Sequence, residues 1–338
     1  MAARDNKIPV VMRYGAAEWD ASAGGHKFVD DFYALTRLEW LVDVTSAEAA
    51  DPADKTRILV QIAAAEGGAA GLSSDICGSI SGAVAALAPD VKRAAPDAAA
   101  AVHAAMCGEP EQLAALPAGQ LEAAVRVAAA LGAEAALARL VGRGAPVDEP
   151  DDDGSTALVS AARAGWAGVV PVLVGGGVEV DKVHPDGSTA FSFAASAGRT
   201  KAVAALLAAG AEVDKPKDNG VTPLFVAAQK GHAEIVAALL AVGAAVDKPK
   251  DDGATPLFVS AQNSHAEVVA ALLAAGAAVD KAENRGLPPL FMAAMNGHPE
   301  MVATLLFAGA DKGVKMRWGT PLEVAQNKGH AEVVALLQ

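Results

Sequence analysis

The second half of the chain repeats one sequence pattern at a fixed interval of 33 residues. A threonine or proline marks the same position in five successive copies, and a sixth marker follows after 32 residues: Thr156, Thr189, Thr222, Thr255, Pro288 and Thr320. The two most regular copies, which begin at Asp214 and Asp247, differ at seven of 33 positions. An interval of this size is typical of stacked repeat arrays and not of closed globular folds.

The copy that begins at Asp214 predicts an extended turn followed by two short helices. Thr222 suits an N-cap, and Pro223 suits the first helical position because its missing N–H would have no helical partner. Gly231 predicts a left-handed end to the first helix, and the second helix starts after it, at His232. Such short helices are unstable alone in water, so their alanines and leucines are buried only when neighbouring copies stack.

This unit resembles the ankyrin repeat. Thr222–Ala227 and Thr255–Ser260 match its T-P-L-H-x-A signature in large part, and the period, cap chemistry and apolar pattern agree over six copies. The resemblance implies an all-α solenoid of helix-turn-helix units with extended turns or β-hairpins between them, over about 97–338. We expect three segments: a helical N-terminal region at 1–95, degenerate capping repeats at 97–148 and six ankyrin repeats at 149–338.

The chain departs from the family signature in three ways. Phe225, Phe258 and Phe291 replace the signature histidine, so we expect ring packing to link neighbouring copies there. The other copies carry Val159, Ser192 and Glu323 at this position. Ser264 stands where the fourth copy needs a left-handed glycine, which costs about 1 kcal/mol and predicts a weak point. Pro288 replaces the threonine cap of the fifth copy.

Upstream of the visible signature the pattern is weaker. Leu121–Asp148 aligns with Gly220–Asp247 without gaps, and part of the pattern recurs at 104–116. We interpret both segments as repeats that cap the stack, and the alternative is an ordinary alanine-rich helical hairpin. In the N-terminal region, periodicity predicts helices near 27–44, 52–65 and 73–88. The aromatic residues there form either a local core or a partner-binding patch.

Composition excludes several classes of function. The net charge is −13, and the acidity is spread over both halves, so nucleic-acid binding is not expected. Two cysteines, Cys77 and Cys107, do not make a disulfide framework, and they favour a reducing compartment. No segment is apolar enough to span a bilayer. We therefore expect a soluble cytoplasmic protein, with the nucleus as the alternative.

The sequence also gives little support for catalysis or metal binding. His232, His265, His298 and His330 occupy one position of the repeat, which indicates a structural role. His184 lies in a turn with Asp181 and Asp186, where a solvated turn is favoured over a metal site. Combinations of Ser, His and Asp have no spacing that favours them over chance. We therefore expect no enzyme activity, no cofactor and no metal.

The resemblance implies that a protein partner binds along the concave face, which the turns and the first helices form. The candidate partner-binding residues are Arg163, Ser196, Lys217, Gln229, Lys230, Lys250, Gln262, Asn263, Arg285, Met295, Asn296, Trp318 and Lys328. Glu283 and Leu287 are also expected to be exposed there. Trp318 favours an interface, and the alternative is a lid over the last helices. The basic residues favour an acidic or mixed-charge partner.

The resulting hypothesis is a monomeric, non-enzymatic scaffold or adaptor. Two alternatives remain open at this point. In one, the repeats target a divergent effector or recruitment module located in residues 1–95. In the other, the N-terminal region contains an enzyme site that carries no sequence signature.

Overall fold

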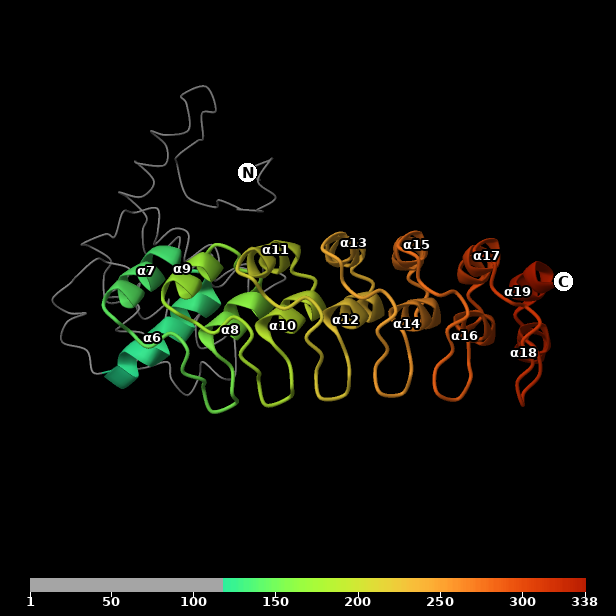
Figure 1. Cartoon of the computed structure of the whole chain (residues 1–338), viewed down its shortest axis with the longest axis horizontal. Helices are drawn as coiled ribbons and strands as arrows, with labels where there is room; N and C mark the ends of the chain where they lie inside the picture. The colour runs from blue at the N-terminus through green and yellow to red at the C-terminus, as the bar shows by residue number, and fades with distance from the viewer. Residues whose placement is uncertain (1–117) are drawn as a thin grey trace, which may run out of the picture. The chain divides into compact units, whose positions relative to one another are not determined.

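The computed structural model describes residues 118–338, which form successive helical pairs (Figure 1). In chain order the helices are α6 (Ala118–Leu131), α7 (Glu134–Gly142), α8 (Ala157–Ala164), α9 (Val169–Gly175), α10 (Ala190–Ser196), α11 (Thr200–Ala208), α12 (Pro223–Lys230), α13 (Ala233–Ala241), α14 (Pro256–Gln262), α15 (Ala266–Ala274), α16 (Pro289–Asn296), α17 (Pro299–Phe307), α18 (Pro321–Lys328) and α19 (Ala331–Leu337). The helices predicted at 27–44, 52–65 and 73–88 lie outside the described residues. From α8 onward, each copy of the sequence pattern contributes one pair.

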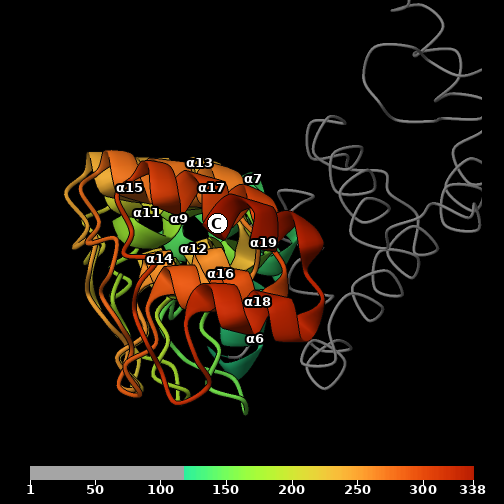
Figure 2. The same cartoon turned by 90° about the vertical axis from the view of Figure 1, so that its right-hand side faces the viewer.

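The pairs stack in two parallel rows. The even-numbered helices α8 to α18, here called the inner helices, pack against one another in chain order. The odd-numbered helices α7 to α19, here called the outer helices, form the second row, and Figure 2 shows both rows along the stack. On the inner helices, Leu158, Leu224, Leu257 and Leu290 are fully buried in the stack. Their burial explains why a single pair is not expected to fold alone. The predicted all-α solenoid is therefore confirmed.

The inner helices begin as the sequence predicts. Each threonine marker accepts a hydrogen bond from the backbone N–H three residues later, as Thr222 does from Phe225 at 3.1 Å. Pro288 has no side-chain acceptor, yet its backbone has the same extended conformation, and α16 starts after it. Gly231 ends α12 with a φ of 76°. Local backbone chemistry thus determines where these helices start and stop.

Extended turns connect each outer helix to the next inner helix. We call them fingers 1 to 6, and they comprise residues 148–155, 181–188, 214–221, 247–254, 280–287 and 312–319. Fingers 3 to 5 are joined by backbone hydrogen bonds, from Asp251 N–H to Asn219 O at 3.1 Å and from Asn284 N–H to Asp252 O at 2.8 Å. These bonds keep neighbouring finger tips in a fixed register.

A ladder of side-chain N–H donors also links successive repeats. His265 Nε2 lies 3.0 Å from the backbone oxygen of Gln229 at the end of the preceding inner helix, and the other three equivalent histidines make the same contact at 3.0–3.2 Å. At the equivalent positions of earlier repeats, Trp166 Nε1 donates to Ala130 O at 2.7 Å and Arg199 Nε donates to Arg163 O at 3.1 Å. The predicted structural role of the four histidines is confirmed.

A second ladder runs along the bases of the fingers. Asp214 accepts the backbone N–H of Ala245, near the end of its own copy, at 3.0 Å, and its backbone oxygen accepts Lys248 Nζ of the next copy at 2.9 Å. Asp181 and Asp247 are bonded in the same way. Each Asp-Lys dipeptide at the start of a copy therefore joins two repeats.

The phenylalanines that replace the signature histidine are buried, and two of them contact the next finger. Lys250 Nζ lies 5.8 Å from the centroid of the Phe225 ring, and the Trp318 ring lies 6.3 Å from that of Phe291. Phe258 is buried as well. Ring contacts across neighbouring copies are thus confirmed for Phe225 and Phe291.

Ser264 is the only non-glycine residue with a positive φ within residues 118–338, at 62°. We expect Ser264→Gly to raise the free energy of unfolding by about 0.5–1 kcal/mol, because relief of the left-handed strain exceeds the added chain entropy. Urea denaturation of the full chain measures the change. A fall in stability would show that the serine side chain contributes more than its backbone strain costs.

The first described helices share features with the later repeats. Gly132 and Gly144 have φ values of 69° and 76°, like Gly231 and Gly243 in the third repeat. Asp148 accepts the backbone N–H of Glu179 at 3.3 Å, as the later aspartates do. These features favour the prediction that 121–148 is a degenerate repeat. Among the described helices, none is long and apolar enough to cross a membrane.

Candidate functional site

The exposed finger tips and the exposed sides of the inner helices form one surface, which we call the finger face. It runs from finger 1 to α18 (Figure 1). The candidate residues predicted from the sequence lie along it. Those with exposed side chains are Arg163, Gln229, Lys230, Asn263, Arg285, Asn296, Trp318 and Lys328, and those half-buried are Ser196, Lys217, Lys250, Gln262 and Met295.

Two of the residues expected to be exposed on this face are buried. Leu287 is only 3% exposed, because the last residue of finger 5 turns inward, as Ser155, Ser188 and Ala254 do at the same position of other fingers. Glu283 is buried at the base of finger 5, where its carboxylate accepts Arg285 Nε at 3.1 Å. The prediction that these two side chains face a partner was therefore wrong.

A cluster beside fingers 2 and 3 centres on Phe193 of α10 and also contains Arg163, His184, Asp186 and Lys217. The Arg163 guanidinium carbon lies 4.5 Å from the Phe193 ring centroid, and Lys217 Nζ lies 5.9 Å from it. The His184 ring meets Phe193 edge to face, with 5.2 Å between the centroids. We call this group the Phe193 cluster. It brings together side chains from three successive repeats around one ring.

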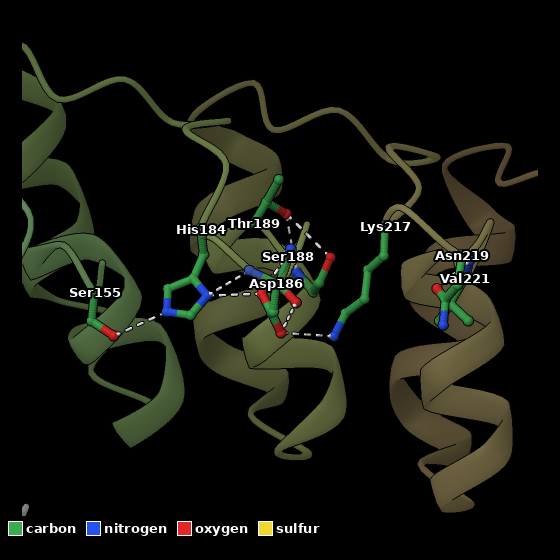
Figure 3. Close-up of polar contacts among 9 residues, drawn as sticks. Ser155, His184, Asp186, Ser188, Thr189, Lys217, Asn219 and Val221 are labelled. Carbon is green, nitrogen blue, oxygen red and sulfur yellow. Dashed lines mark hydrogen bonds and ion pairs between the residues drawn. The ribbon is translucent and has the colours of Figure 1, made fainter. Parts of the chain in front are cut away.

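Asp186 is the anion of the Phe193 cluster, and it joins two fingers (Figure 3). Its carboxylate lies 2.8 Å from His184 Nδ1 and accepts Lys217 Nζ at 3.2 Å. Partial burial acts to raise the pKa of Asp186, but hydrogen bonds from the Ser188 N–H and hydroxyl, from His184 and from Lys217 outweigh it and hold the pKa far below its ordinary value. Asp186 is therefore a fixed negative charge at neutral pH.

Ser155, His184 and Asp186 stand in the order of a catalytic relay, but their geometry favours a structural link. Ser155 Oγ lies 3.5 Å from His184 Nε2, beyond the usual distance for proton transfer. The serine is 4% exposed, whereas the Asp186 side chain is 45% exposed. A nucleophile must meet substrate, so this distribution of exposure is the reverse of what such catalysis requires. Figure 3 shows the three residues joining fingers 1 and 2.

A second cluster lies at the other end of the finger face and contains Phe291, Arg317 and Trp318. We call it the Trp318 cluster. The Arg317 guanidinium carbon lies 3.9 Å from the Trp318 ring centroid, and Trp318 is 44% exposed although it also contacts Phe291. The tryptophan thus packs partly on the preceding repeat, as the lid hypothesis expects, and still presents a large aromatic surface to solvent.

Some candidate side chains between the clusters are already engaged. The side-chain amides of Asn263 and Asn296 donate to the backbone oxygens of Gln229 and Gln262, each at 3.0 Å. These asparagines reinforce the ladder between repeats and keep only part of their hydrogen-bonding capacity for a partner. Within residues 118–338, no group of His, Cys, Asp and Glu side chains is arranged to hold a metal ion.

Sequence reasoning overlooked Phe193, the centre of the first cluster. Other inner helices carry smaller or more flexible side chains at its position: Ser160, Val226, Val259, Met292 and Val324. A single aromatic residue in an otherwise non-aromatic column of the aligned copies is the signal that could have identified it.

Comparison with known protein families agrees with this architecture. A family model described as ankyrin repeats (3 copies) matches residues 125–217, 211–283 and 242–316, which together cover more than half of the chain. The chain therefore belongs to the ankyrin-repeat family. Proteins built from these repeats are generally protein–protein interaction modules and are typically non-enzymatic. No curated protein matches the chain.

Proposed function

We propose that this protein is a non-enzymatic scaffold or adaptor that binds a protein partner on the concave face of its ankyrin array, which corresponds to the finger face. The observation that carries the proposal is the half-exposed Trp318 with Arg317 stacked on it. Tryptophan and arginine are the residues most enriched among those that dominate binding energy at protein interfaces. Trp318 keeps a large exposed aromatic surface although it packs on the preceding repeat, and this exposure supports a role in binding.

The construction of the face supports the same proposal. Two ladders of hydrogen bonds and the bonds between finger tips hold its side chains in register. A pre-ordered surface loses little conformational entropy when a partner binds. In this proposal the six repeats at 149–338 form the binding array, the segment at 97–148 caps it, and the array acts as a monomer.

The test compares two variants of the full chain that remove similar side chains from different faces. Cross-linking and mass spectrometry first identify the partner, and its affinity for each variant is then measured. The face variant combines Arg163→Gln, Lys230→Gln and Trp318→Ser. The control variant combines Arg143→Gln, Lys201→Gln and Phe307→Ser, at exposed positions on the outer row.

We expect the face variant to bind the partner at least about 100-fold more weakly than the unmodified chain, because it removes two residue types that dominate interfaces. The control variant should keep the affinity of the unmodified chain. Unchanged binding of the face variant, or loss of binding in the control alone, would refute the assignment of the partner to this face.

A further inference from the structure

The two clusters share one chemical feature, an arginine stacked on an aromatic ring. Arg163 lies over Phe193, and Arg317 lies over Trp318. A guanidinium stacked in this way is held in place while its N–H edge stays free for a carboxylate, with which it forms two parallel hydrogen bonds. Among the described residues, no carboxylate lies within ion-pair distance of either arginine.

Two lysines of the finger face, Lys217 and Lys250, differ in this respect. Lys217 is paired with Asp186 at 3.2 Å, and Lys250 is paired with Asp252 at 2.7 Å. Burial acts to raise the pKa of Asp252, but the Lys250 bond and charge, with the Ala254 N–H, outweigh it and lower that pKa, so the Asp252 carboxylate stays ionised at neutral pH. Lys217 and Lys250 are thus neutralised from within, whereas the stacked arginines of the two clusters lack an internal counter-charge.

The spacing of the two arginines limits what can bind both. Arg163 is on α8, and Arg317 lies in finger 6, which leads into α18, five helices further along the inner row. Packed helices lie about 8–10 Å apart, so the arginines are about 40–50 Å apart. An extended polypeptide covers this distance with about 12 to 15 residues.

We propose that the finger face binds an extended acidic polypeptide segment through two carboxylate-bearing positions about 12 to 15 residues apart, one on Arg163 and the other on Arg317. This inference rests on the proposed function and specifies the chemistry of the partner. A nucleic acid fits less well, because its phosphates would also pass the exposed carboxylates of Asp186, Asp218, Asp251 and Asp252. A polypeptide can place neutral or basic residues opposite those aspartates.

The experiment uses fluorescent peptides that carry two blocks of three glutamates separated by proline-rich spacers of about 6, 14 or 26 residues. Such spacers extend by about 3.1 Å per residue, so they span about 19, 43 and 81 Å. Fluorescence anisotropy gives the affinity of each peptide for the full chain and for Arg163→Gln, Arg317→Gln and the control Arg143→Gln. Circular dichroism checks that each variant is folded.

We expect the peptide with the 14-residue spacer to bind at least about tenfold more tightly than the other two, because only it engages both arginines at once. Either Arg163→Gln or Arg317→Gln should abolish this advantage, and Arg143→Gln should preserve it. Affinity that does not depend on the spacer, or that survives both single variants, overturns the inference. A 15-nucleotide single-stranded DNA that binds more tightly with the same arginine dependence overturns it as well.

The affinity of the natural partner distinguishes failure of the two-arginine mechanism from failure of the proposed function. If the partner still loses affinity for the face variant described above, the finger face remains the binding surface and only the two-arginine mechanism is wrong. If the partner binds that variant normally, the proposed function itself is wrong.

Discussion

Phe291→Ala should lower the free energy of unfolding by about 3–5 kcal/mol, the usual cost of truncating a fully buried phenylalanine. The Phe291 side chain is completely buried in α16 and contacts Trp318 of the next finger. Its loss leaves a cavity between the fifth and sixth repeats. In a repeat array each unit is stabilised by its neighbours, so α18 and α19 should lose protection from hydrogen exchange before the earlier repeats do.

The chain provides a matched control in the same repeat. Phe307, the last residue of α17, is 96% exposed. Phe307→Ala should change the stability by less than about 0.5 kcal/mol, because truncation at an exposed site leaves no cavity. Urea denaturation followed by circular dichroism measures both variants. Equal effects of the two substitutions would contradict the account in which Phe291 is buried against the next repeat and Phe307 is exposed.

Gly253→Ala should lower the free energy of unfolding by about 2–4 kcal/mol. This is more than the backbone strain of an alanine in the left-handed conformation costs by itself. Its φ is 84°, and a Cβ there would lie 2.7 Å from the backbone nitrogen of Asn284 and closer still to its side-chain oxygen. Finger 5 would have to move away, which breaks the bonds from the Asn284 backbone and side-chain N–H groups to finger 4. Each such bond contributes about 0.5–1.5 kcal/mol, in addition to about 1 kcal/mol of backbone strain.

Gly309→Ala separates the backbone strain from the loss of contact between the fingers. Its φ of 88° is nearly the same, but a Cβ there would meet nothing within 4 Å. Gly309→Ala should therefore cost only the backbone strain, about 1 kcal/mol. Thermal and urea denaturation of both variants give the comparison. A cost at Gly309 as large as that at Gly253 would mean that contact between the fingers contributes nothing measurable.

The regular parts of the fold could be predicted because they depend on local chemistry that recurs in each copy. Thr222, Pro223 and Gly231 fix the start and end of a helix through their own backbone preferences, and the structure agrees at each of them. The same logic indicated a structural role for the four histidines, because four copies carry the same residue. It could not show the ladder that they form, or that Trp166 and Arg199 belong to it, since these two share with histidine only a side-chain N–H.

The candidate site was less predictable because it depends on the direction in which each side chain points. The period placed Leu287 on a finger, but it could not reveal that the last residue of a finger turns into the core. Phe193 stands out in the aligned copies, but the cluster around it could not be predicted, because Arg163 and Lys217 come from different copies. Contacts between copies are set by the stacking geometry and not by the period.

The central claim is that a protein partner binds the finger face of this ankyrin array, and site-specific photo-cross-linking tests it most directly. A photoreactive amino acid is placed in the full chain at Gln229 or Gln262 on the inner helices, or at Ala237 or Ala270 on the outer helices of the same two repeats. All four variants are then exposed to the same purified partner. The account predicts cross-links from both inner-helix positions and none from the outer-helix positions, and the opposite pattern would contradict it.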